Sequence, residues 1–305
     1  MSARVVFLGS KRIGLRCLEV LCESVDARPA AVITIDDTAD ARSVLGEFRA
    51  FCEARAIPLI VADNRHAAEE SILELHPELC VVVGWYWIIP SALLSSVPLG
   101  FVGLHGSLLP KYRGGSPLVW AIINGETEAG ITLFSFTEGM DDGPVWGRHR
   151  IPIGPDDTIG DVLAHAEDGA CSLLAKHIPA IAAGSTAMEK QNEAHATYCA
   201  MRKPEDGEID WSWPAPRIHD FIRAQTDPYP GAFTHRRDEL VRIWRAKQID
   251  ETYYGVPGQI VRFDETSVWV TCGDHKPLAL VTVQVEGDAR VPARAALASL
   301  NLRLR

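Results

Sequence analysis

Two short segments of the chain place an ionisable side chain among small residues, each directly after an apolar run typical of a strand. The segment 103–107 (GLHGS) carries His105, whose small neighbours are expected to leave its ring open to a ligand, and the segment 139–143 (GMDDG) carries Asp141 in a glycine turn. Together, an imidazole and a carboxylate can perform general acid–base chemistry, because the acid sets the tautomer of the ring. Each segment taken alone also has a structural interpretation. His105 can be a structural histidine, and turn statistics favour an ordinary Asp-Gly surface turn for 139–143.

A basic, glycine-rich loop separates the two segments. It carries Lys111, Tyr112 and Arg113 ahead of two glycines and a proline that is typical of a helix start. Such a loop can hold an anion against its backbone N–H groups. The first glycine turn of the chain, with Ser10 and Lys11, resembles a phosphate loop only loosely, since it lacks both the Lys-Ser/Thr ending and the Gly-x-Gly-x-x-Gly pattern.

Three consecutive aromatic residues, Trp85, Tyr86 and Trp87, follow the most apolar predicted strand. Successive side chains of an extended chain point in different directions, so at least one of the three is expected to pack in the core. The others can receive a flat heteroaromatic ligand.

The elements that must position these residues alternate along the first 200 residues. We predict strands at 4–8, 30–35, 58–61, 79–83, 101–104 and 131–137, and helices at 13–21, 48–54, 67–75, 117–123 and 159–177. This alternation predicts a parallel sheet with helices on both faces. Ligands of such a sheet bind beyond the carboxyl ends of its strands, so we expect His105 and Asp141 to meet at one edge.

A second domain is predicted from residue 201, where proline and glycine punctuation becomes dense. We expect a linking helix at 216–223 and then short strands at 240–245, 258–263, 267–272 and 278–285, spaced for a small barrel or sandwich. The predicted division is therefore 1–200 and 201–305. Apolar residues at 278–285 and 295–304 can serve a homodimer interface or close the core of the second domain.

Composition excludes several classes of protein. With 305 residues, 47% of them apolar, the chain can bury a sizeable core and is neither disordered nor fibrous. No apolar run is long enough for a membrane helix and no signal sequence is seen, so we expect a cytoplasmic protein. The seven scattered cysteines predict neither a disulfide framework nor a metal site. The net charge of −10 falls entirely on residues 1–200, which disfavours nucleic acid as a partner.

The run His105–Glu126, followed by Gly130–Thr132 and Gly139–Gly143, resembles the catalytic core of the folate-dependent N-formyltransferases. Residues 202–211 and 229–233 resemble the start of the C-terminal region in the family members that act on tRNA or on sugars. The resemblance implies a Rossmann-like catalytic domain with a smaller β-rich, OB-like barrel. It also implies formyl transfer from N10-formyltetrahydrofolate to a primary amine, with no metal.

The resemblance also assigns roles to individual residues. His105 matches the catalytic histidine and Asp141 the catalytic aspartate. The folate side comprises Trp85, Tyr86, Trp87, Ile88, Gly139 and Asp141, and the acceptor side comprises Ser10, Lys11, Ser107, Lys111, Tyr112 and Arg113.

One position departs from the family pattern. The third catalytic residue is an asparagine two positions before the histidine, and here that position is Gly103. The asparagine amide donates to the oxyanion of the tetrahedral intermediate, and the loss of one such donor costs roughly 2.7–4 kcal/mol. The backbone N–H of Gly103, an ordered water or a protonated His105 are three possible replacements.

The expected activity is transfer of a formyl group to a small amine. We expect His105, oriented by Asp141, to polarise the formyl oxygen or to accept the amine proton, and Asp141 to relay a proton to N10. A nucleotide-linked amino sugar is the favoured acceptor. The alternatives are another amine, including an amino acid derivative or methionyl-tRNA, hydrolysis of the formyl folate, and a folate- or nucleotide-binding module without activity.

Overall fold

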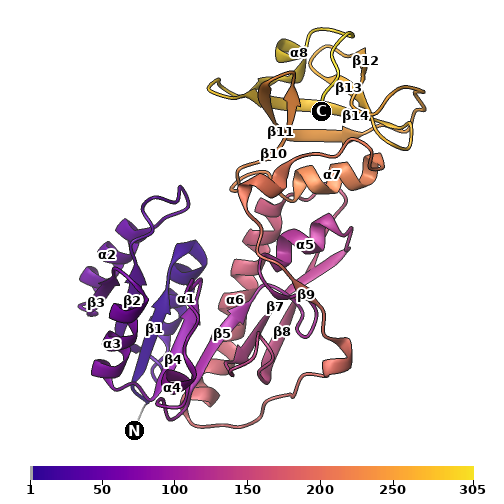
Figure 1. Cartoon of the computed structure of the whole chain (residues 1–305). Helices are drawn as coiled ribbons and strands as arrows, with labels where there is room; N and C mark the ends of the chain where they lie inside the picture. Colours follow the sequence, from indigo (N-terminus) through magenta and orange to yellow (C-terminus); the bar gives the residue numbers. More distant parts are fainter. Residues whose placement is uncertain (1–2) are drawn as a thin grey trace. The chain divides into compact units, whose positions relative to one another are not determined.

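The computed structural model describes residues 3–305, and its contacts group the chain into two compact units (Figure 1). The first unit comprises Met1–Gly114, Ala129–Ile151 and Ala164–Cys199, and the second comprises Gly115–Glu128, Pro152–Leu163 and Ala200–Arg305. The long stretch of the second unit thus begins at residue 200, and two shorter segments from the first 200 residues join it. The division at 200 stays a prediction of where the domains meet along the chain.

The first unit is built on a seven-stranded sheet with the order β3-β2-β1-β4-β5-β7-β8. Its strands are β1 (Val5–Gly9), β2 (Pro29–Ile35), β3 (Leu59–Ala62), β4 (Leu79–Val83), β5 (Phe101–His105), β7 (Glu128–Ser135) and β8 (Val145–Pro152), and a separate two-stranded pair joins β6 (Arg113–Gly114) to β9 (Tyr198–Cys199). Its helices are α1 (Lys11–Glu23), α2 (Leu45–Ala54), α3 (Arg65–Leu75), α4 (Ser91–Leu94) and α6 (Ile159–Ala182), with the short 3-10 helix η1 (Glu193–His195). The first residues of α6, 159–163, are grouped with the second unit.

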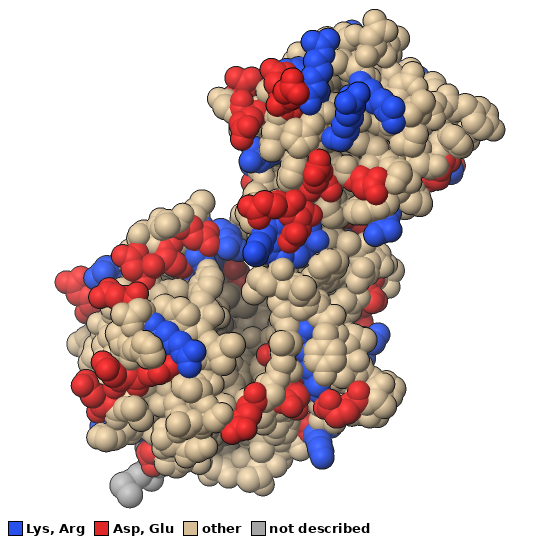
Figure 2. All heavy atoms as spheres, in the orientation of Figure 1, with Lys and Arg blue, Asp and Glu red and all other residues tan. Residues whose placement is uncertain are grey.

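The two faces of this sheet carry separate apolar clusters. Alternate residues of β1 and β4 contribute to one cluster with α1, α2 and α6, and the remaining residues contribute to the other with α3 and α4. The predicted Rossmann-like arrangement, with helices on both faces, is therefore confirmed. Figure 2 shows that acidic side chains predominate over basic ones where α2 and α3 reach the surface.

The predicted parallel sheet is mixed at one end. β5 pairs with β4 in parallel but with β7 in antiparallel, so that His105 lies opposite Thr132 and Val102 opposite Ser135. The apolar run of β7 carries no mark of strand direction. β8 was missed because the polar side chains of 148–150 interrupt its apolar pattern.

The second unit joins short helices to a closed antiparallel sheet. It contains α5 (Pro117–Ile123), η2 (Pro204–Gly207), α7 (Ala215–Arg223) and α8 (Ala293–Ala296), with strands β10 (Ala232–Arg236), β11 (Glu239–Gln248), β12 (Ile260–Phe263), β13 (Val268–Thr271), β14 (Pro277–Val285) and β15 (Val291–Pro292). The strand order is β10-β11-β14-β13-β12, with β15 beside β14. The predicted β-rich second domain is confirmed, and β10 extends the predicted set of strands.

The last residues of the chain connect the two ends of this sheet. Arg236 of β10 bridges to Leu304, and Gln259, just before β12, bridges to Arg303. Backbone hydrogen bonds join His235 to Arg305 in both directions, at 2.8 and 3.0 Å. Because both edge strands of the path are paired with the same segment, the sheet closes as a barrel. Across residues 3–305, no helix has the length and apolar character needed to cross a membrane.

We predict that this closure is a main source of the second unit's stability. Leu304 is 1% exposed, so Leu304→Ala should lower the free energy of unfolding by about 2–5 kcal/mol. Leu300, in the same segment but 52% exposed, supplies the control, and Leu300→Ala should change it by less than about 0.5 kcal/mol. Urea unfolding measures both, and equal effects of the two substitutions would contradict the role given to the closing segment.

Candidate functional site

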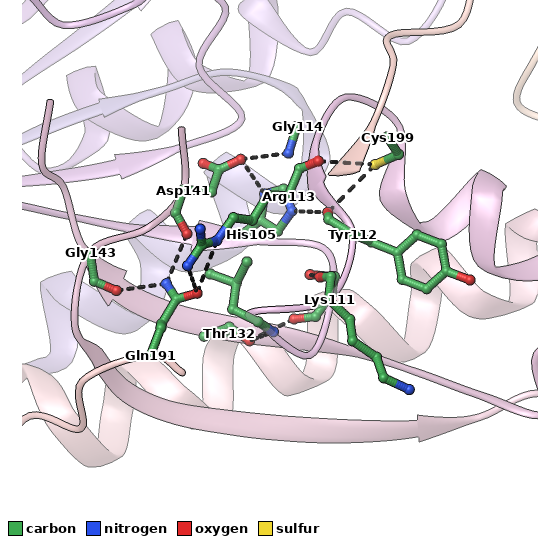
Figure 3. Close-up of polar contacts among 12 residues, drawn as sticks. His105, Lys111, Tyr112, Arg113, Gly114, Thr132, Asp141, Gly143, Gln191 and Cys199 are labelled. Atoms are coloured by element: carbon green, nitrogen blue, oxygen red, sulfur yellow. Dashed lines mark hydrogen bonds and ion pairs between the residues drawn. The ribbon is translucent and has the colours of Figure 1, made fainter. Parts of the chain in front are cut away.

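His105 and Asp141 lie together in the first unit, but not for the reason that the sequence suggested. His105 is the last residue of β5, whereas β7 runs antiparallel and ends beside the start of β5. The loop between β7 and β8 must therefore fold back along β5 to bring Asp141 to His105. Nδ1 of His105 lies 3.4 Å from Oδ2 of Asp141 (Figure 3). The prediction that the two side chains lie close together is confirmed. The reason given for it is wrong, because β5 and β7 are antiparallel and do not end at the same edge of the sheet.

The surroundings of His105 fix the hydrogens on its ring. Nε2 lies 2.7 Å from the carbonyl oxygen of Tyr112, which can only accept a hydrogen bond. Nε2 therefore carries hydrogen, and Nδ1 faces the carboxyl of Asp141. Nδ1 and the carboxyl oxygen Oδ2 are 3.4 Å apart and face each other, so a proton on either of them points toward the other. With only 8% of the residue exposed and both nitrogens engaged, the prediction of a ring left open among small residues is wrong.

Asp141 is held from several sides. Its backbone has φ +49°, a left-handed conformation that is unfavourable for a residue with a side chain. The N–H of Gly114 donates to Oδ2 at 2.8 Å, and Gln191 donates to the backbone carbonyl at 2.8 Å. The turn is tight at both ends, because a Cβ on Gly139 would lie 2.0 Å from Asp142 and one on Gly143 would lie 1.8 Å from the carbonyl of Ser135. Gly139 therefore shapes the turn.

An aromatic ring fills the space where the family's asparagine would begin. Gly103 is buried in β5, between Val82 of β4 and Phe134 of β7. A Cβ at this position would lie 2.5 Å from the ring of Phe136 and 2.9 Å from the carbonyl oxygen of Val82. The Phe136 ring in turn stacks at a tilt on Phe134, with centroids 5.1 Å apart. The wall beside His105 is therefore apolar at this point.

The loop after His105 is stabilised by its own hydrogen bonds. The hydroxyl of Ser107 donates to the carbonyl of Lys111 at 2.6 Å, and the hydroxyl of Thr132 donates to the carbonyl of Ser107 at 2.6 Å. Ser107 is 4% exposed, so its hydroxyl is committed to the loop. These bonds present the Tyr112 carbonyl to His105, while the side chains of Lys111 and Tyr112 point away from the pair (Figure 3).

Arg113, which was predicted on the acceptor side, does not face solvent. It is 1% exposed, and its guanidinium forms an ion pair with Glu193 at 2.7 Å and donates to Gln191 at 2.9 and 3.2 Å. Cys199 lies beside the same loop, with Sγ 3.5 Å from the carbonyl oxygen of Tyr112. Burial, and secondarily the charge of Asp141, raises the pKa of this thiol to about 11, so it is not a thiolate nucleophile at neutral pH.

Ser10 and Lys11 form a second group at the ends of β1, β2 and β4. The Ser10 hydroxyl donates to the carbonyl of Gly84, which joins the turn after β1 to the turn after β4. Nζ of Lys11 forms ion pairs with Asp37 at 2.6 Å and Asp40 at 3.0 Å. Burial disfavours the ammonium, but the hydrogen bonds with these carboxylates outweigh it, so the pKa of Lys11 is raised.

The aromatic segment after β4 divides between core and surface. Trp85 and Trp87 meet edge to face, with centroids 5.3 Å apart, and pack against the apolar cluster under α3. Tyr86 is 53% exposed and Ile88 is 81% exposed, with the Tyr86 ring 5.5 Å from Nζ of Lys11. The expectation that at least one aromatic residue packs in the core is confirmed for two. The indole nitrogen of Trp85 is buried without an acceptor among the residues described.

Sequence reasoning missed three contributors to the site: Phe136, Gln191 and the backbone of Gly114. Phe136 lies in a predicted strand and gave no sign of its contact with Gly103. Gln191 lies in a small, polar stretch with no pattern at all. Within residues 3–305, no group of three or more His, Cys, Asp or Glu side chains can hold a metal ion.

Comparison with known proteins finds relatives of both regions of the chain. The sequence matches the family Formyl transferase over residues 4–178 and the family Formyl transferase, C-terminal domain, over residues 202–301. It is 33% identical to the methionyl-tRNA formyltransferase of Citrifermentans bemidjiense over 305 residues, which cover 98% of this chain and 94% of that protein. The methionyl-tRNA formyltransferase of Geobacter sulfurreducens is 32% identical, with 98% of this chain and 94% of that protein covered.

Solved structures share the fold. The N-formyltransferase of Helicobacter canadensis, solved with folinic acid and dTDP-3-aminofucose, has a TM-score of 0.65 at 20% identity, covering 91% of this chain and 98% of that one. HypX of Aquifex aeolicus, solved with tetrahydrofolic acid, has a TM-score of 0.65 at 18% identity, covering 97% of this chain and 47% of that one.

The contact between Gly103 and Phe136 yields a prediction. Gly103→Asn should lower the free energy of unfolding by about 1–3 kcal/mol, because the new side chain needs space that the ring holds. In the double variant Gly103→Asn, Phe136→Ala, the amide gains that space, so the loss should be smaller than the sum of the two single losses by about 1 kcal/mol or more. A double-mutant cycle by urea unfolding measures this coupling, and additive losses would show that the ring does not occupy the asparagine's place.

Proposed function

Because the chain belongs to the formyl transferase family in both its N-terminal and C-terminal regions, it is a formyl-transferring enzyme, and we propose that it moves a formyl group from N10-formyltetrahydrofolate to the primary amine of a nucleotide-linked amino sugar. One observation carries the proposal. A buried histidine and an aspartate, remote in sequence, lie with Nδ1 and Oδ2 3.4 Å apart at the end of β5, and hydrogen bonds hold the ring and the carboxyl in place.

The proposed chemistry moves two protons. The uncharged amine attacks the formyl carbon and the bond from that carbon to N10 breaks, so the amine loses one proton and N10 gains one. The proton held between His105 and Asp141 is delivered to N10, directly or through water, and the amine's proton returns to the pair. The pair thus ends the reaction in its starting state, as general acid–base catalysis requires.

The same pair is proposed to stabilise the oxyanion. Three groups could replace the missing amide: the backbone N–H of Gly103, a water and a protonated His105. The ring of Phe136 already lies against Gly103, which disfavours a polar group or a water at that position. A protonated His105 would supply the positive charge instead. The residue is only 8% exposed, and electrostatic stabilisation is strong where water is excluded.

Two observations support a folate site beside β4. The exposed side chains of Tyr86 and Ile88 offer apolar surface at the carboxyl end of that strand. The Trp85 indole N–H is a buried donor without an acceptor among the described residues, and a heteroaromatic ring that bears carbonyl and nitrogen acceptors would satisfy it. We propose that the segment 85–88, with the turn at Gly139, receives the pterin.

A small amine is proposed as acceptor because of the charges near the same strand ends. The loop after β2 carries Asp36, Asp37 and Asp40. The ammonium group of Lys11 already forms ion pairs with the last two of these. Acidic side chains also predominate over α2 and α3 (Figure 2). A nucleic acid backbone binds to basic surface. The sugar-formylating neighbour solved with dTDP-3-aminofucose supports a nucleotide-linked acceptor, while relatives at 32–33% identity carry the name methionyl-tRNA formyltransferase.

The catalytic pair is tested by substitution. Asp141→Asn keeps the size of the side chain but cannot share the proton in the same way, and His105→Gln removes the ring. Each should lower kcat by about 10²- to 10⁴-fold while KM for the formyl folate changes far less. Near-normal turnover of either variant in a formyl-transfer assay would remove the pair from the mechanism.

The acceptor is tested by incubating the protein with N10-formyltetrahydrofolate and a panel of nucleotide-linked amino sugars, amino acids and methionyl-tRNA. We expect one amino sugar to gain a single formyl mass. Formylation of methionyl-tRNA alone would replace the proposed acceptor, release of free formate would indicate hydrolysis, and no reaction would indicate a binding module.

A further inference from the structure

Gln191 lies 50 residues from Asp141 in sequence, yet its side chain contacts the turn that carries that residue. It is 4% exposed, in the segment between α6 and η1. This segment is fixed to the start of β8, because Glu189 and Val145 exchange two backbone hydrogen bonds of 2.8 Å. Gln191 therefore extends from an anchored backbone.

Both ends of its amide are used. Nε2 donates to the carbonyl oxygens of Asp141 at 2.8 Å and Gly143 at 2.7 Å, and Oε1 accepts from Nε and Nη2 of Arg113 (Figure 3). An amide group combines two donor hydrogens with an acceptor oxygen. A carboxylate at this position could still accept from Arg113 but could not donate to two carbonyls.

These contacts close a ring of interactions around the catalytic aspartate. The side chain of Arg113 holds Gln191, Gln191 holds the backbone carbonyl of Asp141, and the backbone N–H of the next residue, Gly114, holds the Asp141 carboxylate at 2.8 Å. The carboxylate of Glu193 accepts two hydrogen bonds from the Arg113 guanidinium, at 2.7 Å from Nη2 and 2.8 Å from Nη1. The carbonyl and the carboxylate of Asp141 are thus both tied to the chain at 113–114.

The ring explains how Asp141 keeps an unfavourable backbone. A left-handed conformation in a residue other than glycine costs of order 1–3 kcal/mol and persists only where neighbours over-determine it. The two carbonyls that accept from Gln191 belong to the peptide groups that follow Asp141 and Gly143. These hydrogen bonds therefore fix the turn on the C-terminal side of Asp141. The position of its carboxyl relative to His105 depends on that turn.

We propose that Gln191 is a positioning residue for formyl transfer, which sets the carboxyl of Asp141 against Nδ1 of His105 by holding the turn that carries it. The proposal rests on the proposed function of the pair. Gln191 touches neither ring nor carboxyl, so it acts only through the backbone of 141–143.

The test compares two identical substitutions. Gln191→Glu keeps shape and the contact with Arg113 but loses both donors to the turn. Gln225→Glu is the matched control, because Gln225 is also buried, donates to the carbonyl of Phe221 at 2.9 Å and accepts from Arg202 at 2.8 Å, all within the second unit. A purely structural glutamine would give the same result at either position.

We expect Gln191→Glu to lower kcat by roughly 10- to 100-fold with KM changed by less than about threefold, since a small displacement of a catalytic group acts on turnover. Gln225→Glu should leave kcat within about twofold of the unsubstituted protein. In protein labelled with ¹⁵N-histidine, the Nδ1 resonance of His105, identified by its loss in His105→Gln, should shift in Gln191→Glu and not in Gln225→Glu.

The proposal is overturned if Gln191→Glu has the kcat of the control and an unmoved His105 resonance. If Gln191→Glu does not fold, Glu193→Gln decides by the same two measurements, because this side chain is 63% exposed and acts on the same ring through Arg113. If the unsubstituted protein formylates no amine, the proposed function fails, and the resonance of His105, which needs no substrate, still tests the positioning role.

Discussion

The hydrogen bond between Nε2 of His105 and the carbonyl oxygen of Tyr112 is the interaction on which the account of the site depends. A carbonyl has no hydrogen to give, so this contact of 2.7 Å places a hydrogen on Nε2. The other nitrogen then faces Oδ2 of Asp141 at 3.4 Å, where one proton can serve both groups. The local backbone, and not a side-chain partner alone, therefore determines the state in which the histidine begins its chemistry.

The rest of the first unit holds that geometry rigidly. The Tyr112 carbonyl is presented by a loop that Ser107 and Thr132 tie to itself, and the Asp141 turn is tied to the residues that follow Tyr112. Buried polar networks of this kind are costly when incomplete and rigid when satisfied. The unfavourable φ of Asp141 is thereby confined to the place where a carboxyl is needed, which is common for strained residues at functional sites.

Much of the fold could be predicted from the sequence, because local patterns encode it. The apolar run at Leu79–Val83 and the proline at the start of α5 located these elements within a residue of their observed bounds. The direction of β7 could not be predicted, because strand direction depends on the length and route of the connection that precedes it. The pairing of His105 with Asp141 was expected on the wrong topology and arises from a loop that folds back. Contacts such as Phe136 on Gly103, or Gln191 under Asp141, join residues more than 30 positions apart, and no local pattern records them.

The central claim is that His105 and Asp141 hold a single proton while Nε2 carries a hydrogen toward Tyr112. Neutron diffraction from a deuterium-exchanged crystal measures this directly, because it locates the hydrogens that other methods infer. The account predicts deuterium on Nε2, aimed at the Tyr112 carbonyl, and one deuterium between Nδ1 and Oδ2. A bare Nε2, or no deuterium between the ring and the carboxyl, would contradict it.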